Sequence, residues 1–342
     1  MQRASQTAIG TVIGIDFGGT KIEAALAAAD GTLLDRERLE TRARLGPRQA
    51  LERTAAAVRR LEARAREAHG AFVAGYAAVA PGIVQSERIL LTPNLPGWED
   101  LALARELQQL LGLDHAPAVG NDARAGALAE LRFGALRGAE PGIYLSLGTG
   151  ISAAVTIGDR VLAGANQAAG EIAYADPEVG VRRAPGAAPL EEVVGGKAIG
   201  ERASALLGED VTAAEVFARA ETDVAARTIV HETLDVLARS IANISVLIDP
   251  ELVVLGGGMM ASADVILPAL REHLAATVPF PPRLATAHFT RDASLHGAVA
   301  LALDAVHDLD APDRAARPQP LGVVRIPAVA GESQLATGGT IK

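Results

Sequence analysis

Residues 145–158 read LSLGTGISAAVTIG, and this stretch decides between two folds. Gly148, Gly150 and Ala153 give the spacing G-x-G-x-x-A after an apolar segment, the outline of a dinucleotide-binding turn. Such a turn needs a helix that starts at its third position, because the pyrophosphate binds at that helix N-terminus. Residues 151–157 are instead rich in β-branched side chains and end at a Gly-Asp turn, so they predict a strand. The stretch is therefore a hairpin with a glycine corner, and a nicotinamide cofactor is disfavoured.

A second hairpin of the same kind lies near the N-terminus. Residues 12–17 predict a buried strand, residues 21–28 predict another, and Asp30-Gly31 predicts the turn that follows. Gly18 and Gly19 thus form a corner between two strands. The similar spacing of the two hairpins indicates a duplicated unit, with one copy in each of two lobes.

A third glycine corner follows the apolar residues 252–255, where Gly256, Gly257 and Gly258 let backbone approach a flat ligand such as adenine. Bare backbone N–H groups at such corners can bind an anion. Asp16 stands beside the first corner and would repel phosphate unless a cation lay between them. Three glycine corners after apolar strands predict a nucleotide held between two lobes.

Length, composition and charge limit the class of protein. The 342 residues are 49% hydrophobic and 21% charged, enough for two domains with ordinary cores. No apolar run reaches the roughly 18 residues of a membrane span, and the first residues lack the layout of a signal peptide. A net charge of −9 disfavours nucleic acid, and the absence of cysteine excludes disulfides and thiolate zinc sites. We expect a cytoplasmic protein with no nucleic-acid or membrane partner.

Together these motifs resemble the ROK family of bacterial sugar kinases and repressors, within the hexokinase–actin superfamily. Residues 16–21 resemble its D-x-G-G-T-K phosphate turn, 147–151 its L-G-T-G-I turn, 249–258 its adenosine motif, and 164–171 its G-A-N-x-x-A-G-E stretch. The resemblance runs over about residues 12–306. It implies an α/β fold: a two-lobed, actin-like ATPase (ribonuclease H-like) with a duplicated sheet-and-helix domain and a central cleft.

The resemblance also implies the domains, the cofactors and the nucleotide contacts. We expect a small lobe of residues 1–120 completed by a helix at about 295–308, a large lobe of residues 121–294 with the adenosine site, and a flexible tail at 309–342. ATP and Mg²⁺ are the implied cofactors, and Asp16 is expected to bind the metal through water. A homodimer is also expected. The residues implied in nucleotide binding are Asp16, Gly18, Gly19, Thr20, Lys21, Gly148, Thr149, Gly150, Gly256, Gly257 and Gly258.

Asp122 is the implied catalytic base. On local pattern alone, Asn121 or Asp122 caps the helix predicted at residues 123–133. The family's N-D-A motif makes its aspartate the base, and a helix N-terminus favours the ionised carboxylate. The repressor branch carries a winged helix-turn-helix before the first strand, for which about eleven residues are too few, so we expect a kinase.

Amides and carboxylates are the implied acceptor contacts, because an amide suits a vicinal diol and buried carboxylates need hydroxyl or amino donors. Asn94 has an alternative interpretation as an exposed residue in a plain turn. If the alignment with the family motif is off by one residue, Glu192 takes the place of Glu191. Trp98 is either a wall of the sugar pocket or a core residue. The implied contacts are Asn94, Asn121, Asp122, Glu171, Tyr174 and Glu191.

Tyr174 departs from the family pattern, because it replaces the histidine of E-x-G-H that binds zinc and contacts the sugar. The cysteines that follow are absent and the seven histidines are scattered, so we expect no structural zinc. Arg182 and Arg183 could then hold the loop by pairing with acids. A site with changed polar partners commonly prefers a changed ligand.

The sequence therefore predicts an ATP-dependent, glucokinase-like transferase that phosphorylates the exocyclic 6-hydroxyl of a hexose such as glucose or an aminosugar. One alternative is a kinase of kanosamine or of a hexose-like C7-cyclitol. An alternative of another class is a non-catalytic sugar sensor.

Overall fold

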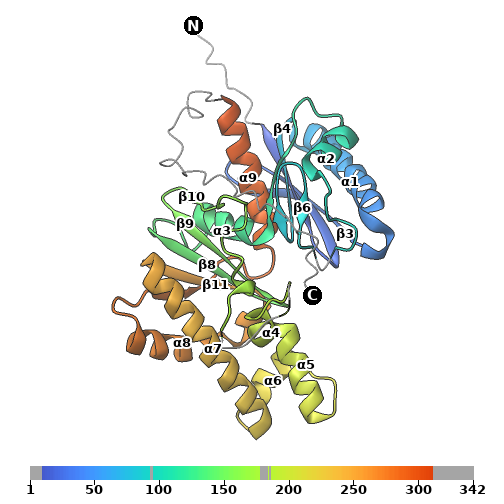
Figure 1. Cartoon of the computed structure of the whole chain (residues 1–342). Coiled ribbons are helices and arrows are strands. Elements are labelled where there is room, and N and C mark those ends of the chain that lie inside the picture. The colour runs from blue at the N-terminus through green and yellow to red at the C-terminus, as the bar shows by residue number, and fades with distance from the viewer. Residues whose placement is uncertain (1–9, 93–94, 178–183, 185, 311–342) are drawn as a thin grey trace, which may run out of the picture. The chain divides into compact units, whose positions relative to one another are not determined.

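The structure is a computed structural model that describes residues 10–92, 95–177, 184 and 186–310. Asn94, Arg182 and Arg183 lie outside the described residues, as does the expected tail from residue 311 onward. Residues up to Val306 form one compact unit built on two five-stranded sheets (Figure 1).

The two sheets have the same strand order and the same strand directions. In each, the first two neighbouring pairs of strands are antiparallel and the last two pairs are parallel. The duplication predicted from the two hairpins is therefore confirmed, as is the α/β class. In spatial order the strands are β3 (Leu33–Glu40), β2 (Lys21–Ala27), β1 (Thr11–Phe17), β4 (Val73–Ala80) and β7 (Ala118–Asn121), then β10 (Arg160–Val161), β9 (Ile151–Ile157), β8 (Gly142–Leu147), β11 (Leu252–Gly256) and β12 (Arg283–Thr286).

The outer face of the first sheet is covered by α1 (Gly46–His69) and α2 (Leu103–Leu111), which bury one apolar core with β1, β2 and β4. The 3₁₀ turn η1 (Ala43–Leu45) precedes α1, and the short hairpin β5 (Ile83–Val84)–β6 (Ile89–Leu90) follows β4. Trp98 is fully buried in this core, with its ring centroid 5.1 Å from that of Phe17. Of the two interpretations of Trp98, the core residue is confirmed and the pocket wall is wrong.

A cluster of helices covers the outer face of the second sheet and forms the largest apolar core with it. α7 is the longest of them, and its N-terminus is capped by the Asp223 carboxylate, which accepts from the N–H groups of Ala225 and Ala226. These helices are α4 (Glu191–Val194), α5 (Gly196–Leu207), α6 (Ala213–Arg219), α7 (Val224–Ile248) and α8 (Ala263–Thr277).

Two helices cross between the sheets, and each packs on the sheet of the other half (Figure 1). α3 (Asp122–Phe133) follows the first sheet, but its Ala127 and Leu131 pack against the second. α9 (Ala293–Asp310) follows the second sheet, but its Leu295 and Val299 pack against the first. Neither sheet is covered on both faces without a helix from the other half.

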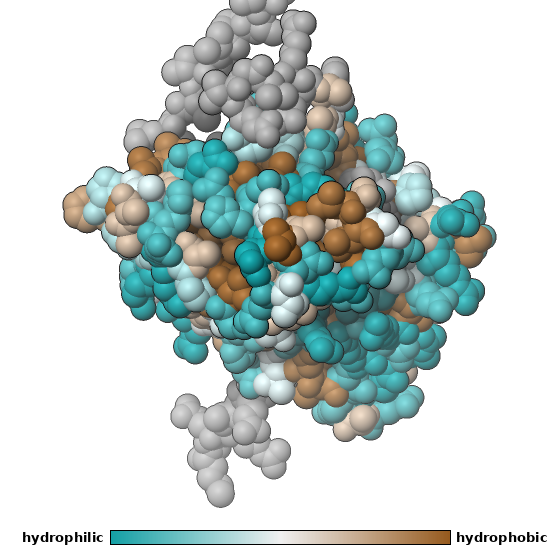
Figure 2. Space-filling view, turned by 90° about the horizontal axis from the view of Figure 1, so that it is seen from below, coloured by the Kyte–Doolittle hydropathy of each residue, from teal (hydrophilic) through white to brown (hydrophobic). Residues whose placement is uncertain are grey.

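In the part of the chain that the structure describes, none of the helices is both long enough and apolar enough to cross a membrane. Seen from below, hydrophilic residues cover most of the face, and apolar residues form separate groups among them (Figure 2).

Candidate active site

Both glycine corners close hairpins, as the sequence predicts. The Gly18 N–H donates to the Lys21 carbonyl at 2.9 Å, and the Gly148 N–H donates to the Gly150 carbonyl at 3.0 Å. Gly148 opens no helix, so the dinucleotide-binding alternative is excluded. At the third corner, Gly257 has a φ of +88° and a Cβ there would overlap the Leu147 backbone. Only glycine allows this close approach of β11 to β8.

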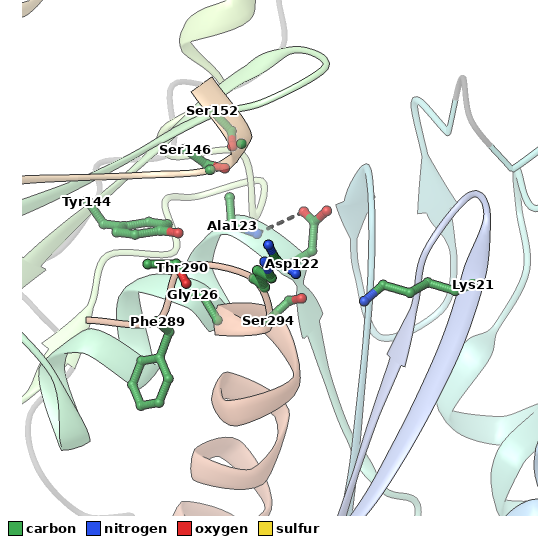
Figure 3. A pocket seen from close by; sticks show the side chains of 14 residues that line it. Lys21, Asp122, Ala123, Gly126, Tyr144, Ser146, Ser152, Phe289, Thr290 and Ser294 are labelled. Atoms are coloured by element: carbon green, nitrogen blue, oxygen red, sulfur yellow. Dashed lines mark hydrogen bonds between the residues drawn. The ribbon is translucent and has the colours of Figure 1, made fainter. Parts of the chain in front are cut away.

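A cavity of about 440 Å³ lies between these corners and the start of α9. Lys21 points into it from the first hairpin, while Asp122 enters from the N-terminus of α3 (Figure 3). The cavity thus brings together residues from both halves of the chain. Its lining consists of Lys21, Asp122, Ala123, Gly126, Tyr144, Ser146, Ser152, Gly257, Gly258, Phe289, Thr290, Arg291, Ala293 and Ser294.

Asp16 and Asp122 belong to one site. Asp16 lies at the end of β1, and its Oδ2 accepts a hydrogen bond of 2.6 Å from the Ser294 hydroxyl at the start of α9. Burial raises the pKa of Asp16 to about 7; the Ser294 hydrogen bond opposes this rise and the charge of Asp122 adds to it. The charge of Asp122 acts on Asp16 only because the two carboxyl groups are close.

Asp122 is oriented by the backbone of its own helix. Its Oδ1 accepts from the Ala123 N–H at 2.8 Å (Figure 3). Burial raises the pKa of Asp122, while the backbone N–H donors and the charge of Arg124 act in the opposite direction. A carboxyl group with a raised pKa at a cavity wall has the properties of a general base.

The residues present fit a magnesium ion that arrives with a nucleotide. In the described part of the chain, no group of three or more His, Cys, Asp or Glu side chains could hold a metal by itself. Mg²⁺ commonly needs only one or two protein carboxylates and takes its other ligands from phosphate and water. Asp16 offers such a carboxylate beside the first glycine corner.

Asn121 acts as the N-cap of α3, as the local pattern suggests. Its Oδ1 accepts from the Arg124 N–H at 3.0 Å, and its Nδ2 donates to the Gly82 carbonyl at 2.8 Å. The amide therefore ties the turn after β4 to the start of α3 and places Asp122. Its expected contact with an acceptor hydroxyl stays a prediction.

Glu191 packs directly on the second glycine corner. Its Oε2 accepts from the Ile151 N–H at 3.1 Å, and a Cβ on Gly150 would overlap this carboxylate. The neighbouring Glu192 is exposed. Of the two registers considered, the structure places Glu191 at the corner.

Glu171 and Tyr174 approach the same region from the 3₁₀ turn η2 (Ile172–Tyr174). Burial raises the pKa of Glu171, the charges of Asp122 and Glu191 raise it further, and the charge of Arg124 lowers it. The pKa of Tyr174 is also raised, by burial and then by Glu171 and Glu191, although the side chain is 40% exposed. The carboxylates of Asp122, Glu171 and Glu191 therefore lie close enough to influence one another, although they come from distant parts of the sequence.

Arg124 is a site residue that the sequence analysis missed. It is buried, and its Nη1 donates to the carbonyl of Gln167, a residue with a φ of 60° in the loop that leads to Glu171. Burial lowers the pKa of Arg124, while the charges of Glu171 and Asp122 raise it. The available signal was an arginine in the first turn of α3, flanked by the small residues Ala123, Ala125 and Gly126.

Comparison with known proteins agrees with this geometry. The sequence profile of the ROK family matches residues 12–305. The N-acetylmannosamine kinase of Shigella boydii serotype 18 is 35% identical over 301 residues, which are 85% of this chain and 98% of that protein.

Two solved structures resemble this chain over nearly their whole length. The ROK hexokinase from Thermus thermophilus has 30% sequence identity and a TM-score of 0.74, covering 87% of this chain and 99% of that chain. A ROK family glucokinase from Streptomyces griseus, in complex with glucose and AMPPNP, has 26% sequence identity and a TM-score of 0.67. The match covers 86% of this chain and 100% of that chain. These similarities confirm the actin-like fold expected from the sequence.

Proposed function

The chain belongs to the ROK family, and from this premise we infer that it is an ATP-dependent sugar kinase acting on the exocyclic primary hydroxyl of a hexose or aminosugar. The observation that carries this proposal is the shared site of Asp16 and Asp122 between two glycine corners. In this proposal Asp16 holds the magnesium ion and Asp122 accepts the proton of the acceptor hydroxyl.

We assign the proton-accepting step to Asp122. The Ala123 N–H fixes one carboxylate oxygen and leaves the other for the acceptor hydroxyl. As that hydroxyl attacks the γ-phosphorus, its proton passes to Asp122, and the bond from the γ-phosphorus to the bridging oxygen of ADP breaks. Asp16 would hold a magnesium ion that arrives with ATP, and that ion would supply charge neutralisation to the phosphates.

The remaining residues bind and orient. The N–H groups of Thr20 and Thr149 and the neighbouring glycines of the two corners would hold the phosphates, with Lys21 beside them. Gly257 and Gly258 would receive the adenosine. Asn94, Asn121, Glu171, Tyr174 and Glu191 would orient the acceptor. Closure of the cavity would exclude water, which otherwise competes as the acceptor.

The acidic surroundings favour an acceptor that carries an amino group. Asp122, Glu171 and Glu191 repel one another electrostatically, with Arg124 as the cation that moderates them. Hydroxyl donors relieve this repulsion in part, and an ammonium group relieves it more because it also brings a positive charge. Tyr174 offers a hydroxyl where the family pattern has a histidine, which is consistent with a changed ring substituent.

An ADP-release assay over a panel of acceptors tests the function. Glucose, mannose, N-acetylmannosamine, N-acetylglucosamine, glucosamine, kanosamine and C7-cyclitols are compared at equal concentration. We expect turnover with a hexose-type acceptor, and the highest turnover with a sugar that carries a free amino group. The NMR spectrum of the product should show coupling between phosphorus and C6. Turnover with cyclitols alone would support that alternative, and no ADP with any acceptor would support a sugar sensor.

Asp122→Asn tests the assignment of the base. The variant should bind the acceptor as the wild type does, while kcat falls by a factor of about 10² to 10⁴, the usual contribution of a general base. Asp264→Asn on the exposed side of α8 is the matched control and should keep full activity. Near-normal turnover of Asp122→Asn would exclude Asp122 as the base.

A further inference from the structure

One wall of the cavity belongs to none of the motifs found in the sequence. It is the segment that runs from the end of β12 into the first turn of α9. The loop contributes Phe289, Thr290 and Arg291 to the lining, and the first turn of α9 contributes Ala293 and Ser294. This wall faces the hairpin of Lys21 from the other side of Asp122 (Figure 3).

The beginning of this segment is held by a buried carboxylate. Glu130 of α3 is fully buried, and its Oε1 accepts from the Phe289 N–H at 2.8 Å. Its Oε2 accepts from the Ala135 N–H at 2.7 Å, so both oxygens are used in fixing backbone. The Phe289 ring stacks on His296 of α9, with 4.3 Å between the ring centroids.

The end of the segment is held from the first sheet. Asp292 Oδ2 lies 3.0 Å from Arg36 Nη1 of β3, and the Ser294 hydroxyl donates to Asp16. Phe289, Asp292 and Ser294 are therefore committed to protein contacts. Thr290 and Arg291 are exposed cavity residues between these fixed points, so their side chains are free to meet a ligand.

Charge decides what Arg291 can bind. Lys21, the other cation of the cavity lining, already pairs with Glu23, a carboxylate only 2% exposed. Among the described residues no carboxylate forms an ion pair with Arg291, although Asp122 shares its cavity. A cavity that receives a triphosphate beside two carboxylates needs a cation that is not already neutralised.

We propose that Arg291 binds the phosphate chain of the nucleotide, as a phosphate-binding cation supplied by the segment before α9. The guanidinium has a fork of donors that matches two phosphate oxygens, and its fixed loop reduces the loss of entropy on binding. The proposal rests on the proposed function, because it requires ATP as the phosphoryl donor.

The experiment compares the kinetics of Arg291→Gln and Arg291→Lys with those of the wild type. We expect KM for ATP to rise about tenfold in Arg291→Gln, as for loss of one charge-assisted hydrogen bond, while KM for the acceptor stays unchanged. Arg291→Lys keeps the charge and should lose less. The control is Arg239→Gln on α7, an arginine whose side chain is 51% exposed and pairs with Asp235, and it should behave as wild type.

An unchanged KM for ATP in Arg291→Gln would overturn the proposal, as would a parallel rise in both KM values, which would indicate a disturbed cavity. Thermal melting of each variant separates loss of fold from loss of binding. If the wild type releases no ADP with any acceptor, the proposed function fails instead, and calorimetric titration of ATP into wild type and Arg291→Gln then tests Arg291 alone.

Discussion

Arg124 links the proposed base to the loop that carries Glu171. Its guanidinium holds the Gln167 carbonyl and lowers the pKa values of both Asp122 and Glu171. One buried cation therefore keeps two neighbouring carboxylates nearer to their ionised form than burial alone would allow.

Arg124→Met should raise the pKa of Asp122, because it removes this cation but keeps an apolar stem. We expect the acid limb of the pH profile of kcat/KM to move to higher pH and the rate near neutral pH to fall on the order of tenfold. Arg124→Lys should restore the limb in part. An acid limb that stays in place in Arg124→Met, with a reduced rate at every pH, would indicate a purely structural role.

Asp16 makes the stability of the ligand-free protein depend on pH. Its pKa of about 7 is above the value of an unfolded aspartate, so the folded state binds the proton more tightly. Stability from this group is complete below the unfolded pKa and is lost as the pH rises through the folded pKa.

Relative to Asp16→Asn, the wild type should therefore lose free energy of unfolding between about pH 4 and pH 8, at roughly 1.4 kcal/mol per unit of pKa difference. Urea unfolding at a series of pH values, without nucleotide or magnesium, measures this difference. Parallel curves for the two proteins would mean that Asp16 titrates normally.

At the scale of elements, the crossing of α3 and α9 depends on glycine. A Cβ on Gly297 would overlap the backbone of Ala125, whereas the nearest atom to a Cβ on Gly120 is 3.5 Å away, an ordinary contact. Gly297→Ala should therefore destabilise the protein by about 1–3 kcal/mol or more through overpacking. Gly120→Ala is the matched control, and calorimetry should find a lower Tm only for Gly297→Ala. Equal Tm values would show that the helices separate at little cost.

At the scale of the whole molecule, the exchange of α3 and α9 joins the two halves into one folding unit. In the first sheet, Val12 and Ala77 are buried against Leu295 and Val299. These two residues belong to α9, the last helix of the fold in sequence. A fragment of residues 1–121 would expose this face and should not fold alone.

The full chain should then unfold in one calorimetric transition, and ATP at about 100 times its Kd should raise the stability of the whole unit by roughly 2.7 kcal/mol. Two separate transitions, or a folded N-terminal fragment by circular dichroism, would contradict this prediction. The residue-121 boundary between lobes would then be a true domain boundary in the thermodynamic sense.

The sequence by itself determined the local elements and the order of the motifs. β-branched residues after Gly148 predict a strand rather than a helix, and Asn121 before an alanine-rich run predicts a helix start, because such preferences act within a few residues. The two glycine corners indicated the duplication for the same reason.

Only the tertiary structure decided which distant groups meet. Arg124 reaches Gln167, Glu191 packs on Gly150, and the segment before α9 becomes a cavity wall beside Asp16. No periodicity or turn signal encodes these contacts, because they depend on the strand order of two sheets and on the crossing of the two helices between them. Local chemistry fixes which residues are available, and packing fixes which of them share a site.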